Sequence, residues 1–127
     1  DRGPAAQAET DFEMGAYHMA RKTISMTIGT GIDEQLNALS EQYGLNKSSL
    51  VNRILQRTFA CDHAIQNLMA VRPADRSRTI KRSYRIEEEI VAFMEQYPDL
   101  SMGTVIEKAV VQLMERNDQQ KREFLFS

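Results

Sequence analysis

Two short segments carry hydrogen-bonding side chains at every second position. Residues 23–28 read Thr-Ile-Ser-Met-Thr-Ile, and residues 79–86 read Thr-Ile-Lys-Arg-Ser-Tyr-Arg-Ile. Hydroxyl groups both donate and accept hydrogen bonds, whereas lysine and arginine donate them and carry positive charge. Such groups suit recognition of a polar or anionic surface rather than a reaction. The candidate binding residues share one parity in each segment: Thr23, Ser25 and Thr27, then Lys81, Ser83 and Arg85.

Other motifs that could perform chemistry are weak. The sequence has no glycine-rich phosphate loop, no nucleophile motif and no carboxylate pair at catalytic spacing. Cys61 and His63 are two potential metal ligands, but no second pair follows at the spacing of a metal site. Glu87, Glu88 and Glu89 suit the first turn of a helix, where negative charge complements the helix dipole. We therefore expect no enzymatic activity, no metal and no cofactor.

Alternation of polar and apolar residues predicts that both segments are β-strands. A lone strand cannot satisfy its backbone or bury one face, so we expect the two strands to pair as an antiparallel ribbon. Arg82 has the inward parity, so we expect it to lie at the ribbon's end or to contact a carboxylate. The remaining inward residues are apolar: Ile24, Met26, Ile28, Ile80, Tyr84 and Ile86.

Two amphipathic helices are predicted after each strand. In the first half Thr30 and Asn46 are the expected N-caps, and Gly44 ends the first helix. The apolar stripe of the second helix leaves open whether that helix continues past Phe59 or breaks near Cys61. In the second half, the glutamates 87–89 are expected to begin the first helix and Pro98-Asp99 to form the turn after it. Ser101 is the expected N-cap of the last helix.

The 127-residue chain therefore reads as one β-α-α unit written twice. Each half alone is too small to bury a sizeable core, so we expect both to share one. The first residues lack sustained periodicity and are expected to derive from an expression vector or to be disordered. The expected divisions are 1–18 for this segment, 19–71 for the first unit, 72–78 for a linker, 79–116 for the second unit and 117–127 for a tail.

The spacing of apolar residues continues into a recognisable series. Ile28, Ile32 and Leu36 fall four residues apart, and Gly44 and Leu45-Asn46-Lys47-Ser48 follow. This series resembles the ribbon-helix-helix superfamily of DNA-binding proteins, the MetJ and Arc type. The second half keeps the four-residue spacing at Ile86, Ile90 and Met94, with Pro98-Asp99 where a glycine is usual. Two copies in one chain resemble relaxosome accessory proteins of the TraY kind, which fold as their own dimer.

The resemblance implies a mainly α-helical pseudo-dimer whose β-ribbon enters the major groove of double-stranded DNA. The six outward residues named above would contact bases. Because the two strands carry different side chains, the DNA site should not be a perfect palindrome. Phosphate contacts would come from the second helix of each copy, at Asn46, Lys47, Ser48, Ser101, Met102 and Gly103, with further attraction from Arg21, Lys22, Arg76, Arg78 and Arg82.

The expected protein is thus a cytoplasmic, sequence-specific DNA-binding protein. It would serve as a transcriptional regulator, such as a repressor, or as an accessory factor of plasmid transfer or maintenance, with self-association on adjacent DNA sites allowed. The formal net charge of −2 does not decide this, because charge position matters more. A single cysteine agrees with a reducing compartment, and no apolar run reaches the ~20 residues of a membrane span.

Three alternatives stay open. Alternating Thr and Ser also occur on an ordinary solvated sheet face, and the basic stretch from Arg72 to Arg85 could be only a linker. The third alternative is a protein-interaction module, such as an antitoxin. It would dock a protein partner through the segment 61–71 or through Phe124-Leu125-Phe126.

Overall fold

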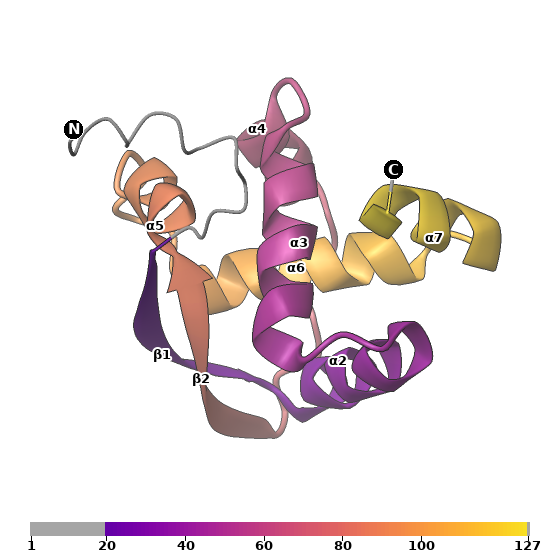
Figure 1. Ribbon diagram of the computed structural model, residues 1–127. Coiled ribbons are helices and arrows are strands. Elements are labelled where there is room, and N and C mark those ends of the chain that lie inside the picture. The colour runs from indigo at the N-terminus through magenta and orange to yellow at the C-terminus, as the bar shows by residue number, and fades with distance from the viewer. Residues whose placement is uncertain (1–19, 127) are drawn as a thin grey trace, which may run out of the picture.

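The computed structural model describes residues 20–126, which form a mostly helical fold with one two-stranded antiparallel sheet (Figure 1). The predicted division at residues 1–18 lies outside these described residues. The elements in chain order are β1 (Arg21–Gly29), α2 (Thr30–Tyr43), α3 (Lys47–Phe59), α4 (Ala64–Met69), β2 (Thr79–Glu87), α5 (Glu88–Met94), α6 (Met102–Met114) and α7 (Asp118–Phe126).

The strands β1 and β2 pair along their whole length. Arg21 lies opposite Glu87, Ser25 opposite Ser83, and Gly29 opposite Thr79. The inward apolar residues of both strands are buried or partly buried, as the alternation predicted. The antiparallel pairing expected from the two isolated strand patterns is therefore confirmed.

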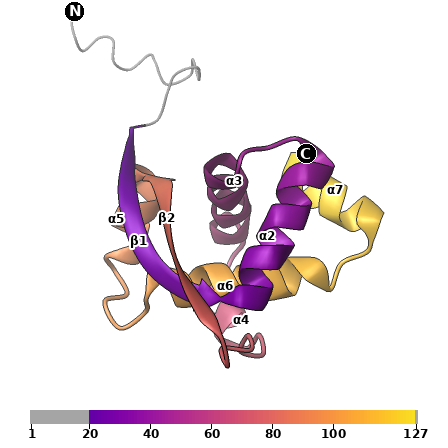
Figure 2. The same ribbon diagram turned by 90° about the horizontal axis from the view of Figure 1, so that it is seen from below.

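Both halves of the chain build one core behind the ribbon. The helices α3 and α6 cross each other there, while α2 and α5 lie toward opposite ends of the ribbon (Figures 1 and 2). Burying a Leu, Ile or Val side chain contributes roughly 1.5–3 kcal/mol, so this shared layer is the main source of stability. Its fully buried side chains include Ile28, Leu36, Leu50, Leu55, Ile86, Val105, Val110 and Leu113.

Three of the expected helix caps are present, and each is formed by residues close together in the sequence. The Asn46 side chain accepts a hydrogen bond from the Ser49 amide at 2.8 Å. Ser101 Oγ does the same for the Thr104 amide at 3.1 Å. Gly44 ends α2 in the left-handed conformation, with φ 68°. The sequence rule that polar caps and glycine mark helix ends holds at these positions.

Both strands run one step further than the sequence suggested. The predicted cap at Thr30 is wrong, because Gly29 is the N-cap of α2 and the Thr30 amide donates to the Arg78 carbonyl at 3.0 Å. Glu87 belongs to β2, so only Glu88 and Glu89 occupy the first turn of α5. Cross-strand pairing explains the difference, since it supplies backbone partners that local sequence does not reveal.

Two further helices, α4 and α7, follow where the sequence analysis had left a continuing helix open and had expected a tail. The helix α3 ends at Phe59, and the chain turns through His63, a non-glycine residue with φ 57°, before the separate helix α4. The tail forms the helix α7, whose Leu125 is fully buried. Arg53 Nη1 of α3 donates to the Leu125 carbonyl at 2.8 Å, which fixes α7 against α3.

Candidate nucleic-acid interface

All six side chains predicted to contact bases lie exposed on the outer face of the ribbon. The register arranges them as three cross-strand pairs. The central pair is joined by a hydrogen bond of 3.0 Å between Ser25 Oγ and Ser83 Oγ. No carboxylate occurs in residues 23–27 or 79–85, so this face combines hydroxyl groups with two positive charges. The outer pairs are Thr23 with Arg85 and Thr27 with Lys81.

Residues with the outward parity direct their backbone N–H groups sideways, away from the partner strand. The Arg85 amide donates to Ser48 Oγ at 3.1 Å, and the Gly29 amide donates to Glu107 Oε2 at 2.8 Å. In an antiparallel ladder, residues whose amides leave the ladder form the non-hydrogen-bonded pairs, whose side chains approach most closely. The outward parity therefore frees backbone groups at both ribbon edges to bind helices.

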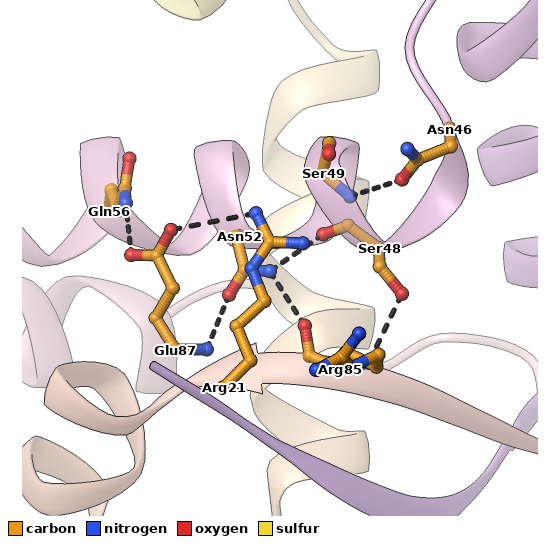
Figure 3. A network of polar contacts seen from close by, with 8 residues as sticks. All are labelled: Arg21, Asn46, Ser48, Ser49, Asn52, Gln56, Arg85 and Glu87. Atoms are coloured by element: carbon orange, nitrogen blue, oxygen red, sulfur yellow. Dashed lines mark hydrogen bonds and ion pairs between the residues drawn. The ribbon is translucent and has the colours of Figure 1, made fainter. Parts of the chain in front are cut away.

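A polar network fastens α3 to the edge of β2 (Figure 3). The buried Asn52 uses its whole amide there. Its Oδ1 accepts from the Glu87 amide, and its Nδ2 donates to the carbonyls of Arg85 and Ser48, each at 2.8 Å. Because unpaired buried polar groups are costly, this set of bonds holds the start of α3 beside Arg85. Asn52 was not predicted as a functional residue, because its only signal in the sequence was a polar residue within an apolar helical stripe.

The same network includes Arg21, which was predicted to contact phosphate. Glu87 is 6% exposed, and its carboxylate accepts a hydrogen bond from Gln56 Nε2. Arg21 Nη2 lies 3.8 Å from Glu87 Oε2. The Arg21 charge is therefore directed at a carboxylate of this chain at the ribbon's end.

The helix α6 lies against the edge of β1 in a different way. Glu107 is 3% exposed, and its Oε2 accepts from the Gly29 amide. Arg76, from the segment between the two units, places Nη1 3.6 Å from Glu107 Oε1 and donates from Nη2 to the Thr27 carbonyl at 3.2 Å. Gly103 is buried, and a Cβ there would lie 2.8 Å from the Thr27 carbonyl oxygen, so glycine allows α6 to approach β1 this closely. Arg76, predicted to attract DNA, thus binds groups of this chain.

These contacts bring the N-termini of α3 and α6 to opposite edges of the ribbon. The first turn of a helix has amide groups without intrahelical partners, and the helix dipole makes it attractive to anions. Of the predicted phosphate contacts, Asn46 and Ser101 are exposed caps, and Gly103 is buried against β1. The others at these helix starts are half-buried: Lys47, Ser48 and Met102.

Arg82 points inward and contacts a carboxylate, one of the two outcomes that its parity predicted. Arg82 Nε and Nη2 donate to Asp33 Oδ1 and Oδ2 at 2.9 and 3.0 Å. These bonds lower the pKa of Asp33 below its ordinary value, although burial acts in the opposite direction. The pair connects β2 with α2, so the Arg82 guanidinium lies away from the outer face.

The last two predicted phosphate contacts differ in their surroundings. Lys22 is exposed near the start of β1 and lines a hollow with the acidic residues Glu88, Glu89 and Glu95. Arg78 is exposed immediately before β2. Arg78 therefore precedes the terminal pair Gly29–Thr79, at the end of the ribbon nearer to Thr27 and Lys81, whereas Lys22 lies near the opposite end.

Of the segments named in the alternative proposals, residues 61–66 line a hollow together with Phe59, Phe93 and Tyr97. Within residues 20–126, no three His, Cys, Asp or Glu side chains are grouped to hold a metal ion. Cys61 is exposed. In the tail, Leu125 is packed inside the protein, Phe124 is half-buried and Phe126 is 43% exposed. Across the same described range, none of the helices combines the length and apolar character that crossing a membrane requires.

Comparisons with protein-family models, with curated proteins and with solved structures each return no match for this chain.

Proposed function

We propose that this chain is a tandem ribbon-helix-helix protein that binds double-stranded DNA sequence-specifically through its β-ribbon. Each strand is followed by two helices, β1 by α2 and α3, and β2 by α5 and α6. The register is symmetric about Ser25 and Ser83, so a two-fold rotation through this pair would exchange β1 with β2. A duplicated unit explains this order and symmetry.

Equivalent residues of the two halves also make equivalent contacts, which supports the duplication. Asn46 and Ser101 cap the second helix of their halves through the same type of side-chain hydrogen bond. Six residues later, Asn52 and Glu107 each accept a hydrogen bond from the amide of the last strand residue of the other half. Each unit is thereby bonded to the opposite strand, as two subunits of a dimer would be.

The observation that carries the proposal is the outer face of the ribbon. It presents six exposed hydrogen-bonding side chains, no carboxylate among residues 23–27 and 79–85, and a helix N-terminus beside each edge. A two-stranded ribbon fits the major groove, where each base pair displays a distinct pattern of donors and acceptors. Helix N-termini bind phosphate oxygens, which fixes the position of a protein on the duplex.

The two ends of this face differ in chemistry, so the site should be asymmetric. Arg85 stands with Thr23 at one end, and Lys81 stands with Thr27 at the other. Arginine forms two parallel hydrogen bonds with guanine O6 and N7, whereas lysine offers a point charge. We expect a guanine at a defined position under Arg85 and a less strict preference under Lys81.

The biological role that we propose is regulation of transcription in the cytoplasm, or assistance in plasmid transfer or maintenance. All three roles use the same contact with DNA. Docking of a protein partner through the tail has less support, because Leu125 is already buried within the fold.

The testing experiment is selection of bound sequences from a random pool of short duplexes, at salt high enough to weaken nonspecific binding. We expect enrichment of a short asymmetric site. Lys81→Ala and Arg85→Ala should each weaken binding to it by roughly 1–3 kcal/mol. Arg122→Ala, which removes the same charge from an exposed position of α7, is the matched control. A folded sample that enriches no sequence would refute the proposal.

A further inference from the structure

The two ribbon edges receive the same pair of hydrogen bonds from different chemical groups. At the edge of β2, the single amide of Asn52 accepts from the Glu87 amide and donates to the Arg85 carbonyl. At the edge of β1, the equivalent backbone groups are the Gly29 amide and the Thr27 carbonyl. Glu107 can accept from the first, but a carboxylate has no proton to donate to the second.

The missing donor at the edge of β1 comes from the linker. Arg76 Nη2 donates to the Thr27 carbonyl at 3.2 Å, while its Nη1 lies 3.6 Å from Glu107 Oε1. The guanidinium therefore supplies the hydrogen bond and also compensates the charge of Glu107, whose side chain is 4% exposed. The Arg76 side chain is itself 42% exposed, but removing it would leave the buried Glu107 carboxylate without this compensating charge, which proteins tolerate poorly.

A second observation places the linker backbone at the same point. A Cβ on Gly29 would lie 2.4 Å from the Asp75 carbonyl oxygen, so the linker passes directly over the end of β1. Asp75 Oδ1 accepts from the Ser77 amide at 2.9 Å, which shapes the turn next to Arg76. The close approach of Asp75 requires a glycine at 29 and leaves Arg76 beside the ribbon edge.

We propose that Arg76 is a positioning residue of the DNA-binding ribbon. Together with Glu107 it replaces the amide that Asn52 provides at the other edge, so the linker sets the geometry of Thr27 and of the adjoining end of β1. This role in base recognition rests on the proposed function, whereas the fixing of the β1 edge is a property of the fold alone.

The test compares four variants: Arg76→Ala, Glu107→Gln, the double variant Arg76→Ala with Glu107→Gln, and Arg72→Ala. Glutamine keeps the length of glutamate, removes its charge and adds an N–H donor that can reach the Thr27 carbonyl. Arg72 is the matched linker control, because it is paired with Glu115 and both side chains are largely exposed. The first readout is hydrogen exchange of the Gly29 amide relative to the Glu87 amide, which Asn52 holds.

We expect Arg76→Ala to accelerate exchange at Gly29 by about tenfold or more relative to Glu87, because its acceptor becomes an unpaired buried charge. The double variant should return this ratio to within about threefold of the wild-type ratio, and Arg72→Ala should leave it unchanged. Should Arg76→Ala fail to fold, recovery of folding in the double variant would support the proposal equally. An unchanged ratio in Arg76→Ala, or no recovery in the double variant, would overturn it.

The second readout is base preference on the selected DNA site. Arg76→Ala should relax preference at the end under Thr27 and Lys81 and leave the end under Arg85 as in the wild type, and the double variant should restore it. Equal loss at both ends would overturn the positioning role. If the wild-type protein binds no DNA, the proposed function fails, and the exchange ratio still decides whether Arg76 fixes the β1 edge.

Discussion

At the scale of single residues, strand parity was sufficient to identify the side chains that face outward. Parity also predicted that Arg82 would lie at the ribbon's end or contact a carboxylate, and Arg82 contacts Asp33. Parity could not identify Asn52, Glu107 or Arg76, because their partners are backbone groups of residues distant in the sequence. Backbone groups leave no pattern in a sequence, so the available signal was limited to one polar residue within each apolar helical stripe.

Asp33 gives a prediction about pH at this same scale. Its pKa is lowered chiefly by the hydrogen bonds from Arg82, so the unfolded chain binds a proton more readily than the folded one. The stabilisation is therefore complete above the ordinary aspartate pKa of about 3.9 and is lost as pH falls through the lower folded value. Asp33→Asn should cost about 1–3 kcal/mol near neutral pH, from weaker hydrogen bonds to Arg82.

Urea unfolding of the wild type and Asp33→Asn, measured from about pH 6 down to about pH 2, checks this prediction. The difference in unfolding free energy between the two proteins should shrink as the acid range is entered. A difference that stays constant down to about pH 2 would mean that Asp33 does not titrate in this interval and that another contact determines the cost.

At the scale of elements, the features predicted best were those set by nearby residues. The caps at Asn46 and Ser101 follow from local side-chain chemistry. The ends of the two strands, at Gly29 and Glu87, depend on pairing between strands and were placed one residue too early, whereas the cap of α2 was placed one residue too late. The helix α7 was not predicted, since its sequence is mostly polar and its buried residue, Leu125, gains a partner surface only when α3 is present.

The close approach of α6 to β1 gives a prediction about two glycines. Gly103→Ala would improve helix propensity, yet its Cβ would lie 2.8 Å from the Thr27 carbonyl oxygen, so the steric cost should prevail. We expect a loss of about 1–3 kcal/mol. Gly31→Ala in α2 is the control, because no atom other than its chain neighbours and its own helix backbone lies within 4 Å of the new Cβ.

Thermal unfolding of both glycine variants measures the two effects. Gly31→Ala should raise the midpoint, since alanine is favoured by up to about 1 kcal/mol in a helix. Gly103→Ala should lower it. A rise in both variants would show that α6 can move away from β1 without cost.

At the scale of the whole molecule, the two halves are complementary rather than interchangeable. Under the proposed two-fold relation, the Arg82–Asp33 ion pair, which joins β2 to α2, corresponds to Ile24 of β1 and Val91 of α5. Pairing β2 with a second β2 would place Lys81 opposite Arg85 and remove Asp33 from Arg82. Buried charges that lose their partners and like charges placed across a ribbon both oppose this arrangement.

Pairing of β1 with β2 inside one chain can be trapped with a disulfide. Ser25 and Ser83 face each other at a position where the backbone groups of the two residues do not bond to each other, and their Oγ atoms lie 3.0 Å apart. A chain with Ser25→Cys, Ser83→Cys and Cys61→Ser should therefore oxidise to a cross-linked monomer. Closing a loop of this length should stabilise it by about 4 kcal/mol.

Because a symmetric β1–β1 ribbon would place position 25 of one chain against position 25 of another, Ser25→Cys with Cys61→Ser serves as control and should stay monomeric after oxidation. Disulfide-linked dimers of this control on a non-reducing gel would contradict pairing within the chain, and a stabilised monomer of the two-cysteine chain would establish that each molecule carries both strands of its own ribbon.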